Sequence, residues 1–262
     1  MMKHAKHTEH TKHEPPQGDF YVGYLPLPWR HSRALRIIIP AVLWVLVLAS
    51  SLLSFLRADS SGSGVWDTVE VREWSGLLYA EPYPMLLTET ADGPAFVPIV
   101  SMLKLGGQAF INGREGKAVT VSGYEIRRDA RTTITIDGAD SIVVSDSEPP
   151  LAPVRQDLGP ITVTGEIVDY KCYLGAMKPG EGRTHRACAI LCIRGGIPPV
   201  LVAPDGEGGR SYYLIVDSDG GPANDAVLGH VAEAVTVTGT LESWGVTNVL
   251  RLAATDALVR AN

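Results

Sequence analysis

The sequence lacks the short motifs that mark the common enzyme classes. It contains neither the G-x-S-x-G nucleophile elbow nor the H-E-x-x-H zinc motif, and no Lys-Ser/Thr pair follows its glycine cluster at residues 206–209. It also has no C-x-x-C pair and no C-x-x-C-H site for covalent haem. A conventional hydrolase, kinase or dehydrogenase is therefore not expected.

Aromatic residues are few, at 7%, and no helical period persists beyond residue 64. Glycine and proline are abundant instead, with 27 and 18 residues, which favours short strands and many turns. With 262 residues, of which 45% are hydrophobic, the chain can bury the cores of one or two domains. We therefore expect a mostly β protein.

One long stretch without charge, Ile37 to Phe55, interrupts this pattern. Its length matches the roughly 20 apolar residues that cross the hydrocarbon core of a bilayer. Arg36 and Arg57 flank it, and Pro40 falls in the expected first turn, where its missing N–H costs little. The stretch predicts a transmembrane helix over residues 37–56.

Charge is distributed unevenly on the two sides of this stretch. Before residue 37 there are six Lys or Arg and three Asp or Glu, so the net charge of −6 for the whole chain leaves −9 for residues 37–262. Basic flanks stay in the cytoplasm, so we expect a single-pass protein of the inner membrane with its C-terminal part in the periplasm. Cleavage as a signal peptide near Ala49 is the alternative, and the 36 residues before the apolar stretch argue against it.

The N-terminal tail, residues 1–19, is polar and rich in histidine and lysine. Four histidines recur at every third position and form a weak candidate metal tract: His4, His7, His10 and His13. No apolar period orders this tail, so we expect a disordered cytoplasmic segment. Residues 20–36 are aromatic and then basic, which is typical of an interfacial anchor or of a docking segment for a membrane subunit.

Beyond a linker at residues 57–67, the chain is internally repeated. Residues 118–123, AVTVSG, match residues 234–239, AVTVTG, and an alternating strand follows each, at residues 131–136 and 247–252. A glycine interrupts a strand at two equivalent places in each half, as the corners of small closed barrels require: Gly76, Gly123, Gly165 and Gly239.

These halves predict two tandem five-stranded barrels that resemble the OB-fold, at residues 68–147 and 160–262, with a Pro-rich joint at residues 148–159. One larger β-sandwich with internal pseudo-symmetry is the alternative. OB-folds often bind nucleic acid, but the acidic balance of this part would repel phosphate. We therefore expect no nucleic-acid partner.

The two halves differ in one segment, which holds all three cysteines of the chain. Thr184 is a candidate N-cap and Gly195 a candidate C-cap of a short helix there. Four side chains form the candidate site, the last three spaced i, i+3, i+7 on one face of that helix: Cys172, His185, Cys188 and Cys192.

Three interpretations of this cysteine module remain open. The oxidising envelope favours a disulfide, which would join Cys172 to Cys188 or Cys192, because the last two are one helical turn apart and badly placed to pair. Three thiolates and an imidazole also form a complete tetrahedral set for zinc, and soft sulfur ligands suit Cu(I). A cysteine near His185 with a lowered pKa would instead support redox or nucleophilic chemistry.

The module also resembles a widespread group of poorly characterised bacterial exported domains. The similarity covers about residues 160–253, with the segments ITVTGEIVDYKCYLG, THRACAILCIRGGIPPVLV and AVTVTGTL. The shared Cys…His-x-x-Cys-Ala-x-x-Cys segment and the Gly-x-Pro turn after it comprise these residues: Cys172, His185, Cys188, Ala189, Cys192, Gly196 and Pro198. The resemblance implies an OB-fold and an exported location, and it transfers no activity.

Together these features predict a membrane-anchored accessory protein of the cell envelope. Because no active site is recognisable, the β domains are expected to dock, without catalysis, on a membrane redox or metalloprotein complex. The alternative is a protein that binds zinc or copper, or exchanges thiols, through the cysteine module. A third class, a barrel groove that binds a small molecule or peptide, names no ligand.

Overall fold

A computed structural model describes three ranges of the chain: residues 29–56, 64–145 and 155–261. The chain divides into two units, Met1–Ala58 with the N-terminal helix and Asp59–Asn262 with the strands. Several predicted features lie outside the described residues: the tail 1–19 with His4, His7, His10 and His13, most of the segment 20–36, and most of the linker 57–67.

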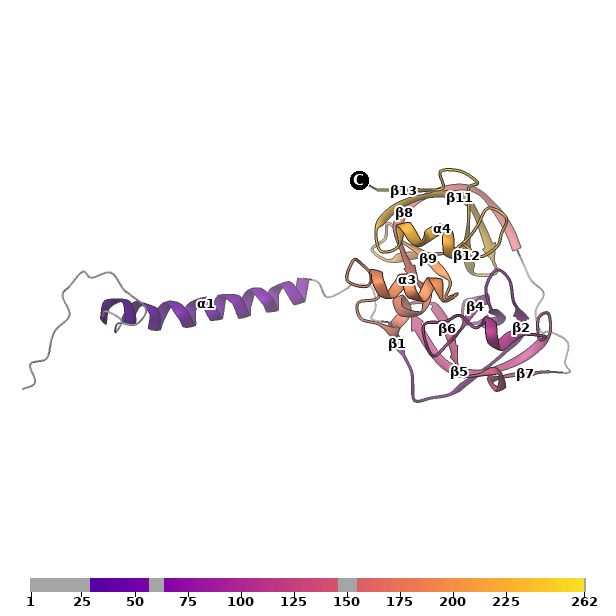
Figure 1. Cartoon of the computed structure of the whole chain (residues 1–262), viewed down its shortest axis with the longest axis horizontal. Helices are drawn as coiled ribbons and strands as arrows, with labels where there is room; N and C mark the ends of the chain where they lie inside the picture. Colours follow the sequence, from indigo (N-terminus) through magenta and orange to yellow (C-terminus); the bar gives the residue numbers. More distant parts are fainter. Residues whose placement is uncertain (1–28, 57–63, 146–154, 262) are drawn as a thin grey trace, which may run out of the picture. The chain divides into compact units, whose positions relative to one another are not determined.

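The first unit contains α1 (Trp29–Leu56), a helix long and apolar enough to cross a membrane (Figure 1). It begins at Trp29 and not at residue 37 as predicted, because the residues between are good helix formers such as leucine, alanine and arginine. Pro40 therefore lies inside the helix and not in its first turn. An internal proline is tolerated in an apolar helix where neighbouring groups satisfy the freed carbonyl.

The second unit begins with a closed barrel of five strands. They are β2 (Arg72–Tyr79), β3 (Met85–Thr90), β4 (Gly93–Ser101), β5 (Ala118–Arg128) and β6 (Arg131–Ile136). The pairing runs β5-β2-β3-β4-β6 and returns from β6 to β5, with β4 and β6 parallel and the other neighbours antiparallel. This is the strand order of the OB-fold.

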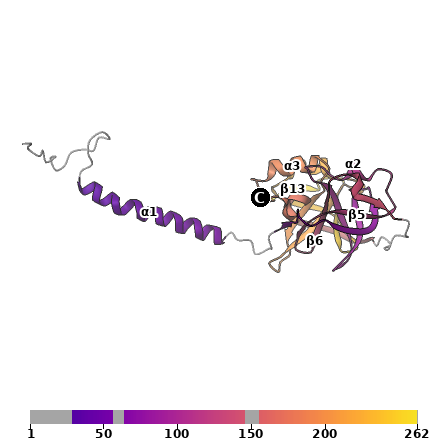
Figure 2. The same cartoon turned by 90° about the horizontal axis from the view of Figure 1, so that it is seen from below.

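The second barrel repeats this arrangement. Its strands are β8 (Arg155–Asp169), β9 (Pro199–Pro204), β10 (Arg210–Val216), β11 (Ala234–Trp244) and β12 (Thr247–Leu252). They pair as β11-β8-β9-β10-β12, β12 returns to β11, and β10 and β12 are parallel. Figure 1 shows the two barrels next to each other, and in Figure 2, the view from below, their strands overlap. The two separately closed sheets confirm the predicted pair and not the single sandwich.

Shorter elements extend the barrels. β1 (Val65–Trp66) and β7 (Ile142–Val144) pair with β5, and β13 (Leu258–Arg260) pairs with β11. Short helical turns follow β4, β6 and β10: α2 (Gln108–Ile111), η1 (Ala139–Ser141), α4 (Asn224–Val227) and η3 (Leu228–His230). Two predicted boundaries move, because β1 falls inside the expected linker and β8 begins inside the expected joint at residues 148–159.

Two of the in-strand glycines are explained by a close approach of the next strand. A Cβ on Gly76 of β2 would lie 2.1 Å from the carbonyl oxygen of Leu87, and one on Gly239 of β11 would lie 2.0 Å from that of Arg251. Real side chains do not fit at such distances. Glycine is therefore needed where the neighbouring strand crosses these positions.

Three apolar cores hold the second unit together. One fills the first barrel around Leu78 and Ile134, and one fills the second barrel around Ile167 and Leu250. The third lies between the barrels and takes side chains from both, among them Tyr83, Phe96, Tyr173 and Trp244. Since such a shared core is lost if the halves separate, the barrels behave as one folding unit.

Polar bonds reinforce this junction. The hydroxyl of Tyr83 donates to the carbonyl of Ile215 at 2.7 Å and accepts from the backbone N–H of Ala223 at 2.9 Å. The backbone N–H of Phe96 donates to the hydroxyl of Thr247 at 3.1 Å. Because these groups are buried, each bond lost here leaves a polar atom without water or protein to replace it.

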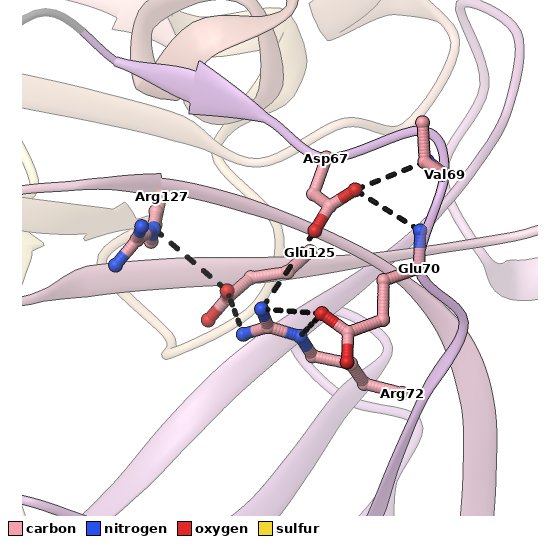
Figure 3. Close-up of polar contacts among 6 residues, drawn as sticks. All are labelled: Asp67, Val69, Glu70, Arg72, Glu125 and Arg127. Carbon is pink, nitrogen blue, oxygen red and sulfur yellow. Dashed lines mark hydrogen bonds and ion pairs between the residues drawn. The ribbon is translucent and has the colours of Figure 1, made fainter.

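The segment that leads from β1 into β2 is fixed by charge (Figure 3). The guanidinium of Arg72 pairs with Glu125 of β5 at 2.6 Å and with Glu70 at 2.9 Å, and Asp67 lies 3.7 Å away. Hydrogen bonds from the backbone N–H groups of Glu70 and Val69 lower the pKa of Asp67. Arg72 and Glu70 are solvent-exposed, and Asp67 and Glu125 are only partly buried, so these pairs position the entry of the chain more than they stabilise the fold.

Candidate metal centre

The cysteine module is an insertion between the first two strands of the second barrel. It contains a short π-helical turn, η2 (Cys172–Ala176), and the helix α3 (Arg186–Arg194). In the first barrel the same connection comprises only residues 80–84. The prediction that an extra segment distinguishes the two halves is thus confirmed.

The insertion brings all four predicted side chains into one cluster. Ligand atoms of Cys172, His185 and Cys188 lie within 4.8 Å of one another, and so do those of Cys172, Cys192 and Asp169. Cys172 belongs to both groups and joins them. Asp169 was not among the predicted site residues, although its place three residues before Cys172 at the end of a buried strand is a usable signal.

Helix α3 differs from the prediction at its start. His185, and not Thr184, occupies the N-cap position, and its side chain makes no capping bond. The imidazole instead reaches Asp169, with 3.0 Å between His185 Nε2 and Asp169 Oδ2. Gly195 ends the helix as predicted, and its N–H donates to the carbonyl of Leu191.

Asp169 orients two members of the cluster. Its side chain is completely buried, and Oδ1 accepts the backbone N–H of Cys172 at 2.8 Å while Oδ2 faces His185. A carboxylate that accepts from Nε2–H fixes the tautomer and leaves the lone pair of the imidazole on Nδ1. This carboxylate–histidine pairing is the arrangement that metal-binding histidines use in proteins.

The three cysteines are free, and no disulfide joins them. The Sγ atoms of Cys172 and Cys192 are 3.8 Å apart, whereas a disulfide bond is about 2.05 Å long. Around a tetrahedral zinc ion with Zn–S bonds of about 2.3 Å, two sulfur ligands lie about 3.8 Å from each other. The observed separation therefore matches two thiolates on one ion.

Positive charge surrounds the sulfur atoms. Lys104 Nζ donates to Cys188 Sγ at 2.6 Å, and this bond raises the pKa of Lys104. Lys171 is buried beside the cluster, and its ammonium donates to the carbonyls of Ser101, Met102 and Leu103 at 2.7–2.8 Å. Burial lowers the pKa of Lys171, while the neighbouring sulfur atoms and Asp169 oppose that shift.

The hydrogen bond between the buried thiols of Cys172 and Cys192 shifts their two pKa values in opposite directions. Cys172 shares its proton with Cys192, which lowers the pKa of Cys192 and raises that of Cys172. This hydrogen bond therefore favours the thiolate form of Cys192 over that of Cys172.

The first barrel closes over the module. Residues 101–106, the loop after β4, supply Lys104 and the three carbonyls that hold Lys171. The N–H of Gly106 donates to the carbonyl of Gly195 at 2.8 Å, and a Cβ on Gly195 would lie 2.0 Å from the carbonyl oxygen of Lys104. The site is thus completed by the half of the chain that has no cysteine.

No protein-family model, curated protein or solved structure matches the chain significantly. The resemblance of residues 160–253 to exported OB-fold domains therefore stays a prediction.

Proposed function

We propose that this protein is a membrane-anchored zinc-binding protein of the cell envelope. The ligands are the thiolates of Cys172, Cys188 and Cys192 and the Nδ1 atom of His185. The observation that carries the proposal is the 3.8 Å separation of two buried sulfur atoms beside a histidine that a buried carboxylate orients. Three sulfur ligands and one nitrogen complete a closed tetrahedral site.

Charge favours zinc over Cu(I). A divalent ion, three thiolates, the Asp169 carboxylate and the ammonium groups of Lys104 and Lys171 together carry no net charge. A monovalent ion in the same site would leave one negative charge in a largely buried place, which is costly. Soft ligands still bind Cu(I), so it is the competing ion to test.

The location is part of the proposal. The helix α1 supplies the span, and the basic excess before residue 37 favours a cytoplasmic N-terminus and a periplasmic metal domain. A closed site without an open coordination position is typical of a structural or carrier site and not of a catalytic one. The predicted role beside a membrane redox or metalloprotein complex is compatible with a carrier, and it stays a prediction.

Elemental analysis of the full chain in mild detergent tests the zinc site. The four tail histidines are replaced by alanine in every sample, so that they contribute no metal. We expect about one zinc per chain, lost in Cys172→Ser and in His185→Ala. His31→Ala, a histidine exposed on α1, is the matched control and keeps the metal.

Intact mass without reduction separates the alternatives. A metal-free chain that is two protons lighter than its reduced form would show a disulfide, and the site would then be a structural staple in a docking protein. If elemental analysis finds one copper and no zinc per chain, the proposed ligands stand and the bound ion is copper. A zinc-loaded chain with three free thiols after chelation supports the proposal.

Thiol exchange is a second candidate, favoured by the hydrogen-bonded pair Cys172 and Cys192. In that reaction the two thiols lose two electrons and two protons, and a partner disulfide becomes two thiols. Incubation of the metal-free chain with oxidised glutathione measures it by the release of reduced glutathione. Release at the rate of an ordinary exposed thiol would exclude this candidate.

A further inference from the structure

The members of the cluster differ in their access to solvent. Cys192, His185 and Cys172 are 1%, 3% and 4% exposed. Cys188 alone among the four is partly exposed. Leu191, one helical turn further along α3, is 54% exposed, so this face of the helix is open to an approaching molecule.

Cys188 also accepts a hydrogen bond from a lysine of the other barrel. The ammonium of Lys104 lies 2.6 Å from its sulfur atom and is itself on the surface, on a loop of the other barrel. Hydrogen bonds to ionised groups are among the stronger ones in proteins. A Cys188 thiolate that leaves a metal ion therefore has a cation within hydrogen-bonding distance to stabilise it.

We propose that metal enters and leaves through Cys188, by exchange with a thiolate of an acceptor protein, and that Lys104 is the positioning residue for this step. The inference rests on the proposed zinc site. The bond between zinc and the acceptor sulfur forms as the bond between zinc and Cys188 Sγ breaks. The released thiolate keeps its electron pair and accepts the Lys104 hydrogen bond, so no oxidant or proton donor is needed.

The geometry also predicts the order of events. Because Cys172, Cys192 and His185 remain bound while Cys188 is replaced, the ion is held by a mixed set of ligands before it departs. Transfer must then depend on the concentration of the acceptor. Spontaneous loss of the ion followed by capture would give a rate independent of it.

The test uses the full chain in detergent, with the tail histidines replaced, loaded with one zinc. A synthetic peptide that carries a C-x-x-C pair is the acceptor, and zinc in the ultrafiltrate is measured against time. We expect a rate that rises with peptide concentration. Lys104→Met is expected to slow transfer about tenfold, the order of one charged hydrogen bond, and Lys104→Arg to restore most of the rate.

Lys117→Met is the matched control, since Lys117 is an exposed lysine on the turn before β5 and the substitution removes the same charge. The zinc content of each variant is measured first, so that failure to bind is told apart from slow exchange. Zinc bound normally, with equal rates in Lys104→Met and Lys117→Met, would overturn the inference and leave the zinc site intact. A rate independent of the peptide would overturn it as well.

Discussion

At the scale of single residues, the site depends on groups that bind no metal themselves. Asp169 contacts the imidazole of His185 and accepts the backbone N–H of Cys172. The buried ammonium of Lys171 interacts electrostatically with the sulfur atoms of Cys172 and Cys192. The four candidate ligands were predictable, because cysteine and histidine at helical spacing form a recognisable pattern. Asp169 could have been found from its place three residues before Cys172. Lys104 could not, since a hydrogen bond between segments 84 residues apart leaves no periodic mark on a sequence.

Asp169→Asn tests the orienting role. The amide keeps the shape of the side chain but lacks the charge that favours Nε2–H, so Nδ1 of His185 is less strongly fixed toward the ion. We expect zinc affinity to fall about 10–100-fold, measured by competition with a chromophoric chelator. Asp225→Asn, at an exposed aspartate of α4, is the control, and an equal loss there would contradict the role.

At the scale of elements, most strands of the two barrels were visible in the sequence, and two of them, β3 and β9, were not. The short strands β1, β7 and β13 outside the barrels were not predicted either. The repeated strands β5 and β11 alternate between buried and accessible residues, as the matched segments predicted, and β12 does so in part. The alternation predicted for β6 is wrong: its last four residues are all buried, because the hydroxyls of Thr133 and Thr135 bond to backbone carbonyls and need no water. β3 and β9 begin as continuous buried runs, MLLT and PVLVA, which have no alternation to read. Proline at both ends of β9 further hides it.

Gly195→Ala tests the contact between α3 and the loop after β4. The added methyl group would meet the Lys104 carbonyl at 2.0 Å, so the loop must move away from the helix. We expect a loss of about 1–3 kcal/mol in the free energy of unfolding, together with faster zinc loss, from urea titration and chelator release. Gly138→Ala, with open space at its Cβ, should change neither. Unchanged zinc retention in Gly195→Ala would show that the loop does not guard the site.

At the scale of the whole molecule, the second unit is a pair of barrels that share a core. The sequence showed two related halves, but it did not show that they pack face to face, because both halves have the same apolar pattern. In the sequence, the side chains that fill the junction, such as Tyr83 and Trp244, cannot be told apart from residues inside a barrel. Only the folded chain distinguishes the inside of a barrel from the junction of two.

Tyr83→Phe tests the junction. Loss of the hydroxyl leaves the Ile215 carbonyl and the Ala223 N–H buried without their partner. We expect the free energy of unfolding to fall by about 1–3 kcal/mol in a single cooperative transition, followed by tryptophan fluorescence. Tyr213→Phe, at a partly buried position of β10, is the control. Two separate transitions in the wild type would show that the barrels unfold independently.

Metal removal tests how far the site supports the fold. The proposed zinc ion would bind the folded state through ligands that the unfolded chain does not assemble, so its removal is expected to lower the melting temperature. At free zinc about 100 times the dissociation constant, binding contributes about 2.7 kcal/mol. The melting temperature should therefore rise with zinc concentration in the wild type and stay constant in Cys172→Ser, as measured by thermal scanning.

The buried ammonium of Lys171 has a consequence for how such a protein can move. Its three carbonyl acceptors all belong to the other barrel. A hinge motion that separated the two barrels would therefore leave the buried ammonium without its hydrogen-bond acceptors, which is energetically costly. The hydrogen bonds of this buried cation thus hold the two barrels together. A metal ion bound at the proposed site would therefore be released by a local change at Cys188 and not by a hinge motion of the two barrels.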